Sequence, residues 1–480
     1  MLKRYFRLEE NNTDVRTEMT AGVATFLTMA YIIVVQPLIL SGTFPGLEPT
    51  GMDPGAVMTA TCIAAAIATA WMGLFARLPI AQAPGMGTNF VFVVSLIPAA
   101  QIMINQAVAS GELTEGETTA WQVALGVVLI SGIAFLLGSL LGVRRLLLKG
   151  LSPSMWNAIP IGIGLFIAMI GLKGASLIVA DPGTMVSMNP NIAGPDIGLF
   201  FFGLFATSAL FCRKVKGSII WGMLLTTAVA FGLRELIPLL PEIIANSETV
   251  KNSMLMTQFA PADGVVSLAP SIRPTFFQFD LARAVWPAMI PFILIFLYLD
   301  IFDTMGTLAG VLKAADLVED GEIPNGNRAF LSDAVGTVAG AALGTSTVTS
   351  YIESAAGVEQ GGRTGLTSLT TAGLFLIAPF FAPLVVMIGS YPVITAPALV
   401  IVGALMMQNV RDIDWKNSAE ALPAFITFVT IPLTYSIANG MALGFISYPV
   451  IKTLAGQHRD VRWLNWLLAA ILVVYLVTLY

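Results

Sequence analysis

Apolar segments long enough to cross a lipid bilayer recur along the whole chain. Clear examples run over about 19–40, 57–76, 119–143 and 284–312. Only 11% of the 480 residues are charged, whereas a soluble protein uses about 25% to solvate its surface. Since one crossing takes about 20 residues, the chain has room for about fourteen spans and no large soluble domain. A water-soluble enzyme, a nucleic-acid-binding protein and a disordered chain are therefore all disfavoured.

The charged and metal-binding residues exclude several kinds of site. The net charge of −5 provides no basic surface for nucleic acid. His458 is the only histidine, which removes histidine metal clusters and Ser-His or Cys-His catalysis within a core. Cys62 and Cys212 both lie in apolar runs, so no disulfide framework is indicated. We expect no cofactor, no metal and no nucleic-acid partner.

Lysine and arginine residues indicate which side of the membrane each loop faces, because cytoplasmic loops are enriched in them. The N-terminal residues 1–18 are basic, and alternate later loops, such as 144–149 and 213–216, carry most of the other Lys and Arg residues. The intervening loops, such as 40–55 and 101–119, are acidic or neutral. This alternation predicts a multi-pass protein of the cell (inner) membrane with a cytoplasmic N-terminus.

A polar stretch at 241–283 divides the chain into two halves. We expect it to be an irregular external loop, because it is rich in Pro, Asn and Ser. After the cytoplasmic residues 1–18, the first repeat would cover 19–240 and the second 284–480. An odd number of spans in each half forces the halves into opposite orientations, which predicts two inverted seven-span repeats.

The apolar segment at 461–479 does not fit an even number of spans. About fourteen crossings return the chain to the cytoplasm near Lys452, yet this segment follows. It is a fifteenth crossing, a cytoplasmic helix associated with the membrane surface, or a sign that an earlier span is miscounted. The sequence leaves these alternatives open.

Two carboxylates interrupt the apolar span at 284–312. Asp300 and Asp303 are three residues apart and therefore share one helical face. An ionisable group in hydrocarbon costs several kcal/mol unless it faces a cavity or a partner, so it is a candidate site by default. The structural alternative is an acid bonded to neighbouring backbone or hydroxyl groups.

The segment 344–357 contains a further carboxylate after a run of hydroxyl groups. Thr345, Thr347, Thr349 and Tyr351 alternate with smaller or apolar residues, a period that favours a short extended segment. Glu353 follows at the junction with a helical turn, whose free N–H groups attract negative charge or an electron-rich ligand. Extended backbone at membrane depth requires protein or a wet cavity around it. Helix packing through hydroxyl groups is the alternative.

A second interrupted span lies in the first half, at 81–89. Pro84 and two glycines break the helix there, while Gln82 and Asn89 supply amide groups. Each half thus has one broken span, the third and the tenth. Corresponding interruptions in two halves are the best sequence indication of a central transporter site.

Five segments together resemble the AzgA-like purine permeases of the nucleobase–ascorbate transporter superfamily. They are 25–31 (TFLTMAY), 83–89 (APGMGTN), 300–307 (DIFDTMGT), 345–357 (TSTVTSYIESAAG) and 361–365 (GGRTG). The resemblance implies an all-α polytopic membrane protein in which spans 3 and 10 are broken by short extended segments. It also implies a core domain (spans 1–4 and 8–11) moving against a gate domain (spans 5–7 and 12–14), in a homodimer.

The resemblance further implies a purine between the broken spans, facing the eighth span. The candidate binding residues are Glu353, Asp303, Asn89, Thr307, Thr349, Gly87 and Ser354. The candidate proton-coupling residues are Asp303, Glu353 and Asp300. Gln36 stands where the family usually has Asn, and Gln82, Thr88 and Phe90 also depart from the pattern, so we expect these positions to affect which purine is preferred.

The sequence therefore predicts proton-coupled uptake of purine nucleobases, with hypoxanthine and guanine ahead of adenine and with Na⁺ left open as the coupling ion. An anion carrier of the same architecture is a second hypothesis, which the carboxylates Asp303 and Glu353 argue against. An intramembrane enzyme is a third; Asp300 and Asp303 lie too close on one helix for a two-helix aspartyl dyad. We expect a transporter and no enzyme.

Overall fold

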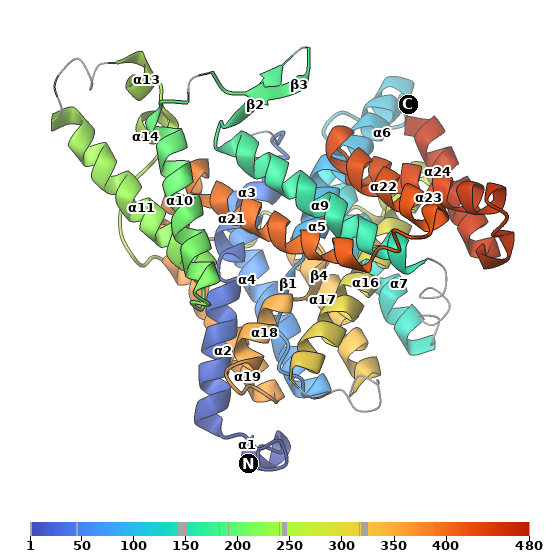
Figure 1. Cartoon of the computed structure of the whole chain (residues 1–480), viewed down its shortest axis with the longest axis horizontal. Coiled ribbons are helices and arrows are strands. Elements are labelled where there is room, and N and C mark those ends of the chain that lie inside the picture. Colours follow the sequence, from blue (N-terminus) through green and yellow to red (C-terminus); the bar gives the residue numbers. More distant parts are fainter. Residues whose placement is uncertain are drawn as a thin grey trace.

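The computed structural model is mainly helical (Figure 1). It describes residues 2–44, 47–141, 152–181, 183–190, 192–239, 241, 247–315, 317 and 325–479, and the basic loop predicted at 144–149 falls outside them. Within these residues, 10 helical segments are long and apolar enough to cross a membrane. Shorter apolar helices run over Ser418–Leu433 and Trp463–Val474. The predicted polytopic α-helical membrane protein is confirmed, while the count of about fourteen spans stays a prediction.

The first half contains most of its helices before a short β-hairpin. In order, its elements are α1 (Leu2–Tyr5), α2 (Val15–Met29), α3 (Ile32–Leu40), α4 (Pro54–Trp71), β1 (Gln82–Pro84), α5 (Met86–Val91), α6 (Ile97–Ser110), α7 (Ala120–Leu141), α9 (Pro153–Gly174), β2 (Ile178–Asp181), β3 (Met185–Met188), α10 (Pro195–Cys212) and α11 (Ser218–Leu236). Strands β2 and β3 pair antiparallel, an element that the sequence did not predict.

The second half follows a polar stretch that contains the short helices α13 (Glu248–Lys251), α14 (Met254–Thr257) and α15 (Leu281–Ala284). Its elements are α16 (Ile290–Ala314), α17 (Gly326–Leu343), β4 (Val348–Ser350), α18 (Ala355–Val358), α19 (Gly365–Ile377), α20 (Ala382–Ser390), α21 (Pro392–Met406), α22 (Ser418–Leu433), α23 (Ile437–Leu454) and α24 (Trp463–Leu479). The C-terminal helix α24 packs against α23 and contacts α16.

Polar residues at the ends of apolar runs define where helices begin. Asp14 precedes α2 and accepts a hydrogen bond from the Thr17 N–H at 2.8 Å. Asp53 precedes α4 and accepts from the Ala56 N–H at 2.7 Å, with Pro54 in the first turn. These side chains satisfy N–H groups that the helix itself leaves unpaired, and a Pro in the first turn removes another.

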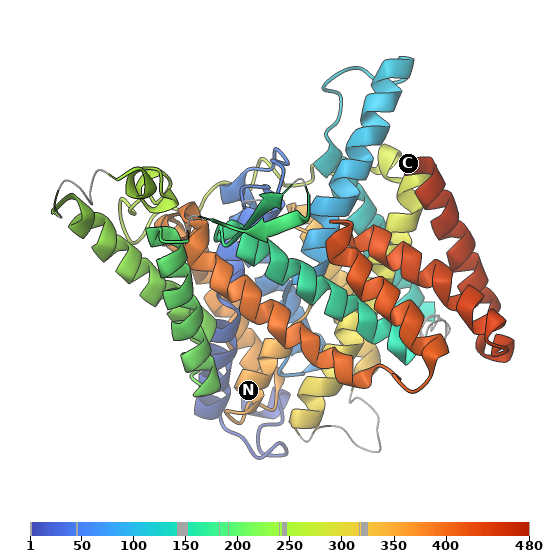
Figure 2. The same cartoon turned by 45° about the horizontal axis from the view of Figure 1, so that its top comes forward.

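The helices form two groups that confirm the predicted core and gate architecture. In the core group, α19 packs against α2 and α4, and α17 packs against α4 and α7. In the gate group, α9 packs against α21 and α22, and α10 packs against α11 and α21. Figures 1 and 2 show α9 and α21 running side by side, with α10 and α11 at one end.

Two short strands pair at the centre of the core group, as expected for the broken third and tenth spans. Strands β1 and β4 pair antiparallel, with Gln82 opposite Ser350, Ala83 opposite Thr349, and Pro84 opposite Val348. The pairing joins segments more than 260 residues apart and supplies backbone partners in a region where lipid offers none. Figure 1 shows both strands surrounded by the helices of the core group.

The gate helices α9 and α21 touch at a pair of glycines. A Cβ atom on Gly403 would lie 2.4 Å from the Gly164 carbonyl oxygen, and one on Gly164 would lie 2.7 Å from that of Gly403. Such close backbone approach is the usual way in which membrane helices gain contact energy.

We predict that Gly403→Ala lowers the unfolding free energy in detergent by about 1–3 kcal/mol, because the added methyl group must push two backbones apart. Gly373→Ala is the matched control: Gly373 lies in α19 with no atom within 4 Å of its added Cβ. The control should be neutral or stabilising by up to about 1 kcal/mol. If both variants unfold at the same temperature, the close contact between α9 and α21 at Gly164 and Gly403 is contradicted.

Candidate functional site

Asp303 and Asp300 lie one turn apart on α16 but have different surroundings. The Asp303 side chain is exposed, although it lies within a long apolar helix. Asp300 is fully buried. Helix α16 packs against β4 and against the turn Ile352–Ser354 that follows β4. Asp303 is therefore the member of the pair that a ligand can reach.

Glu353 lies in that turn and is held by the first span. Its side chain is half-buried, and its Oε1 accepts a hydrogen bond from the Tyr31 hydroxyl at 2.9 Å. Its backbone oxygen accepts from the Thr28 hydroxyl at 3.3 Å. The charges of Glu353 and Asp303 are close enough to interact. The structure thus brings together the two carboxylates that the sequence placed on the eighth and tenth spans.

Gly85 marks the close approach between the broken third span and this carboxylate pair. A Cβ atom on Gly85 would lie 2.9 Å from Thr349 Cγ2 and 3.8 Å from Asp303 Oδ2. The residue next in sequence, Met86, begins α5, whose first N–H groups have no partner within the helix. A residue with a side chain at position 85 would therefore crowd the surroundings of Asp303.

Three hydroxyl residues predicted for the site surround this region. Thr349, Ser354 and Thr307 are all buried, and Thr307 lies one turn beyond Asp303. The Thr349 hydroxyl lies 3.1 Å from the Thr304 hydroxyl, and the Ser354 hydroxyl accepts from the Ala81 N–H at 3.0 Å. Ser354 thereby holds the end of β1. Direct contact of these residues with a ligand stays a prediction.

Asn89 belongs to a neighbouring buried network. Its amide donates to Gln36 Oε1, and the Ser346 hydroxyl donates to Asn89 Oδ1. The Gln36 amide also donates to the Thr345 hydroxyl at 3.1 Å. Gln36, the residue that departs from the family pattern, thus joins the first, third and tenth spans behind the carboxylates.

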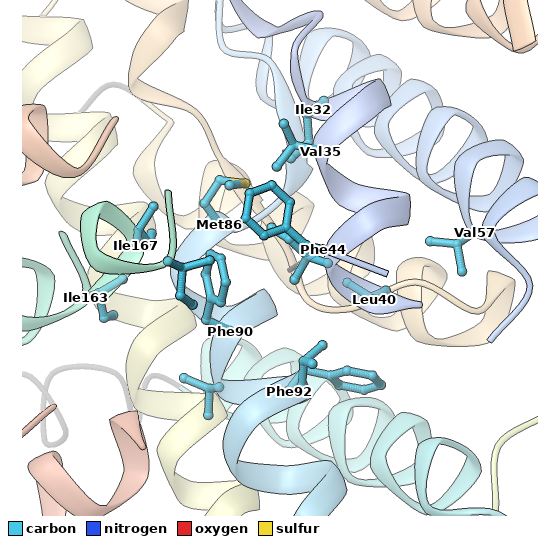
Figure 3. Close-up of a cluster of buried hydrophobic side chains, with 14 of the residues drawn as sticks. Ile32, Val35, Leu40, Phe44, Val57, Met86, Phe90, Phe92, Ile163 and Ile167 are labelled. Atoms are coloured by element: carbon cyan, nitrogen blue, oxygen red, sulfur yellow. The ribbon is translucent and has the colours of Figure 1, made fainter. Parts of the chain in front are cut away.

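Gly87 lies where the core group meets the gate group. A Cβ atom on Gly87 would lie 3.1 Å from Ile163 Cδ1 on α9. Figure 3 shows Phe90 of α5 beside Ile163 and Ile167 of α9 in one apolar cluster. Phe90 also meets the Phe166 ring edge-on, at a centroid distance of 5.7 Å. An apolar contact therefore joins α5 of the core group to α9 of the gate group.

Asp333 on α17 is a buried carboxylate that the sequence reasoning missed. It accepts hydrogen bonds from the Gln82 amide at 2.8 Å, from the Ser350 hydroxyl at 3.0 Å and from the Thr304 hydroxyl. These donors come from β1, β4 and α16, so one side chain joins all three to α17. The signal was present, because Asp333 is an acid within an apolar segment.

Glu18 is a second buried carboxylate that was missed, and its role is structural. It is fully buried and accepts hydrogen bonds from the N–H groups of Arg363 at 2.9 Å, Thr364 at 3.3 Å and Thr367 at 3.1 Å. These N–H groups lie at the start of α19. A carboxylate of the first span therefore caps a helix of the second half.

Two further observations concern other places where a ligand or a metal ion could bind. A cavity of about 480 Å³ lies between α6 and the loop before α7, and none of the predicted site residues lines it. Among the residues that the structure describes, no three His, Cys, Asp or Glu side chains are grouped to hold a metal ion.

Comparison with known proteins decides the family. A model described as the permease family (xanthine/uracil permeases) matches residues 16–443. The chain belongs to this family. The resemblance to purine permeases of the nucleobase–ascorbate transporter superfamily is confirmed, and the chain is a membrane permease and not an enzyme.

The curated relatives match over nearly their whole length. A guanine/hypoxanthine permease of Bacillus subtilis is 38% identical over 484 residues, covering 100% of both chains. An adenine permease of Escherichia coli is 36% identical, covering 96% of this chain and 92% of its own. A protein of Methanocaldococcus jannaschii that is named as a permease is 43% identical, covering 98% of this chain and 97% of its own.

Solved structures support the fold alone. The transmembrane domain of the cyanobacterial bicarbonate transporter BicA aligns with a TM-score of 0.56 and 16% identity, covering 88% of this chain and 96% of that domain. SLC26A9 aligns with a TM-score of 0.58 and 10% identity, covering 92% of this chain and 66% of the other. The fold is thus shared with anion transporters, whereas the sequence family is that of permeases for nucleobases.

We predict that Asp333→Leu destabilises the protein far more than Ser350→Ala does. The leucine removes the shared acceptor of three buried donors, at about 1–3 kcal/mol for each donor that finds no other acceptor, whereas the alanine removes one hydrogen bond that contributes about 1 kcal/mol. Thermal unfolding of both variants in the same detergent measures the difference. If Asp333→Leu unfolds at the wild-type midpoint temperature, the Asp333 carboxylate does not stabilise the paired strands β1 and β4.

Proposed function

We propose that the chain imports purine nucleobases together with protons by alternating access of its core and gate groups. The observation that carries the proposal is the convergence of Asp303 and Glu353 beside the β1–β4 crossing, in a chain whose full-length relatives are named guanine/hypoxanthine and adenine permeases. The substrates in these names are those of the relatives. In this chain, Asp303 and Glu353 are the residues that would bind a purine.

The chemistry of the two carboxylates suits a purine with adjacent donors. Guanine presents a ring N–H beside an amino group, and a carboxylate can accept both in a bidentate manner. Hypoxanthine retains the ring N–H, whereas adenine has an acceptor at that ring position. Glu353, held by the Tyr31 hydroxyl, would accept these donors, and the exposed Asp303 would face the opposite edge of the ring. Guanine and hypoxanthine are therefore expected to bind better than adenine.

Alternating access would follow from the apolar contact between the two groups. Phe90, Ile163 and Ile167 make no directional hydrogen bonds through their side chains, so α5 and α9 can slide past each other at modest cost. The purine site, by contrast, belongs entirely to the core group, so it would move as a unit. We expect the N-terminus to be cytoplasmic and the permease to act as a homodimer in the cell membrane.

An anion carrier is the second candidate, since BicA and SLC26A9 share the fold. The proposal does not favour it, because two carboxylates beside the strand crossing would repel an inorganic anion. Thermal stabilisation of the purified protein separates the two candidates: purines should raise the unfolding temperature, and bicarbonate or sulfate should not.

We predict that Glu353→Ala abolishes uptake of labelled hypoxanthine and guanine, and that Glu353→Gln weakens it. A charge-assisted hydrogen bond contributes about 1.5–3 kcal/mol, so the half-saturating concentration of Glu353→Gln should rise by roughly 10- to 100-fold. Glu359→Gln is the matched control, because Glu359 is an exposed acid six residues further on.

The measurement is initial uptake in cells that lack their own purine permeases, with expression normalised by immunoblot. Competition by unlabelled guanine, hypoxanthine and adenine then ranks the substrates. Wild-type uptake of all three purines in Glu353→Ala would reject the site, and loss of uptake in Glu359→Gln would show that any nearby charge matters.

We predict that purine entry is accompanied by proton entry. Purified wild-type protein in vesicles that contain a trapped pH indicator should acidify the lumen when hypoxanthine is added outside, at equal starting pH. Replacing external Na⁺ with choline should leave this signal unchanged. If hypoxanthine uptake requires Na⁺ and does not acidify the lumen, proton coupling is contradicted, while the proposed purine site is not.

A further inference from the structure

The cavity between α6 and the loop before α7 has a buried floor and an exposed rim. Its volume of about 480 Å³ lies within the range of about 300–1,000 Å³ that is usual for small-molecule sites. Ile104, Thr118 and Ala120 are buried and line its floor, whereas Asn105 and Glu115 are exposed and line its rim. The cavity is therefore open to solvent at one end and sheltered from it at the other.

Thr118 provides an unpaired hydroxyl group at this floor. The residue is 7% exposed, and its buried Oγ1 has no hydrogen-bond partner among the residues that the structure describes. Buried polar groups are almost always hydrogen-bonded, because losing water without gaining another partner is costly. Since Thr118 lines the cavity, a molecule that occupies the cavity is in position to supply that partner.

The other polar groups around the cavity include both hydrogen-bond donors and acceptors. The Gln101 amide donates to Asn105 Oδ1 at 2.9 Å, which leaves the Gln101 carbonyl oxygen and the Asn105 amide hydrogens for a ligand. The Glu115 carboxylate adds an acceptor at the rim. None of the lining residues is Lys, Arg or His, so no cationic side chain of the cavity balances an anion. The donor and acceptor groups therefore favour an uncharged ligand that carries both kinds of group.

Apolar side chains form the rest of the cavity wall. Ile104, Val108 and Ala109 line it from α6, and Ala120 lines it from the start of α7. Such a wall suits the apolar face of a flat ring, while the polar groups meet the edge of the ring. A metal ion is disfavoured, because Glu115 is the one carboxylate among the lining residues. A purine nucleobase has these properties: two apolar faces, and donors and acceptors around its edge.

The loop that closes the cavity is held in place by contacts along its length. Gly111 ends α6 with a φ of 78°, which lets the chain reverse its direction there. Leu113 is buried in the main hydrophobic cluster. Glu117 forms an ion pair with Arg283 of α15, and its Oε2 accepts from the Thr114 N–H at 3.2 Å. The cavity is therefore bounded by a loop with a defined conformation.

Thr50 connects the cavity with the contact between the core and gate groups. It lines the cavity, its hydroxyl donates to the Leu40 carbonyl oxygen at 2.5 Å, and its N–H donates to that of Ser41 at 3.1 Å. The loop that Thr50 closes in this way contains the buried Phe44. A Cβ atom on Gly174, at the end of α9, would lie 2.7 Å from Phe44 Cε1. The same loop thus lines the cavity and packs against the gate group.

We propose that this cavity is a second purine-binding site, separate from the carboxylate site between the broken spans. The inference rests on the proposed import of purines. The N–H groups of the purine donate to Glu115 and to the Gln101 carbonyl oxygen, and its ring nitrogens accept from Thr118 and Asn105. Both loops that line the cavity belong to the side of the membrane that the charge distribution predicts to be external. The site therefore holds a purine where it enters, beside the loop that packs against the gate group.

The test is equilibrium dialysis of labelled hypoxanthine against the purified full-length protein. The wild type should bind two molecules per chain. Glu353→Ala, which removes the carboxylate site, should retain one of them. Ala109→Trp should retain the other, because Ala109 is an exposed lining residue and the indole ring fills the cavity. The double variant should bind none. If Glu353→Ala does not fold, the comparison of the wild type with Ala109→Trp still counts the sites.

Thr118→Val tests the unpaired hydroxyl group in the Glu353→Ala background, where the cavity is the remaining site. Loss of one hydrogen bond should weaken hypoxanthine binding by about 2- to 12-fold. Thr114→Val is the matched control, because Thr114 is exposed in the same loop and does not line the cavity. The control should bind hypoxanthine as its Glu353→Ala parent does. Equal affinities of the Thr118→Val and Thr114→Val variants would overturn the assigned contact.

The possible results separate this inference from the proposed function. If the wild type binds one purine and Glu353→Ala binds none, the cavity holds water only, and the second site is rejected while the carboxylate site stands. If Ala109→Trp binds as many purines as the wild type, the cavity is likewise rejected. If Glu353→Ala binds as the wild type does and Ala109→Trp binds none, the carboxylate site fails and the cavity stands. A wild type that binds no purine contradicts both.

Discussion

The rest of the structure depends on how extended backbone is satisfied within a membrane. Lipid offers no hydrogen bonds, so a chain that leaves the helical conformation there must pair with another part of the protein. Strands β1 and β4 solve this by pairing with each other across the two halves. The pairing fixes where α5 begins and where Glu353 lies, and it brings Gly85 close to Asp303. The candidate site is a consequence of this one backbone requirement.

Carboxylates of the core group serve three different purposes. Glu18 caps α19 from the first span, Asp333 joins both strands to α16 and α17, and Glu353 and Asp303 face the accessible region. What separates them is the number of donors. Glu18 and Asp333 each accept at least three hydrogen bonds, which is typical of a structural acid, whereas the candidate ligand groups retain free acceptor capacity.

Much of the architecture could be predicted from the sequence because every span is surrounded by the same hydrocarbon environment. Hydrocarbon imposes the same length and apolarity on every span, so the segments at 119–143 and 284–312 correspond to α7 and α16 with small shifts at their ends. The threonines that alternate with smaller or apolar residues before Tyr351 predicted the extended segment that contains β4. Asp333 and Glu18 were missed because their roles depend on donors from segments far away in the sequence. The β2–β3 hairpin was missed because its mixed, partly exposed residues carry no clear period.

The sequence by itself determined that this is a polytopic membrane permease with two broken spans, and it predicted that the site lies among a few acids. These properties follow from composition, from the length of apolar segments and from local motifs, all of which are read along the chain. Only the tertiary structure decided which acids face which donors. The same residue type at 300, 303 and 333 has three different environments, because each depends on which helix or strand packs against it. Hydrogen-bond partners across spans are set by packing, and packing is a property of the whole fold.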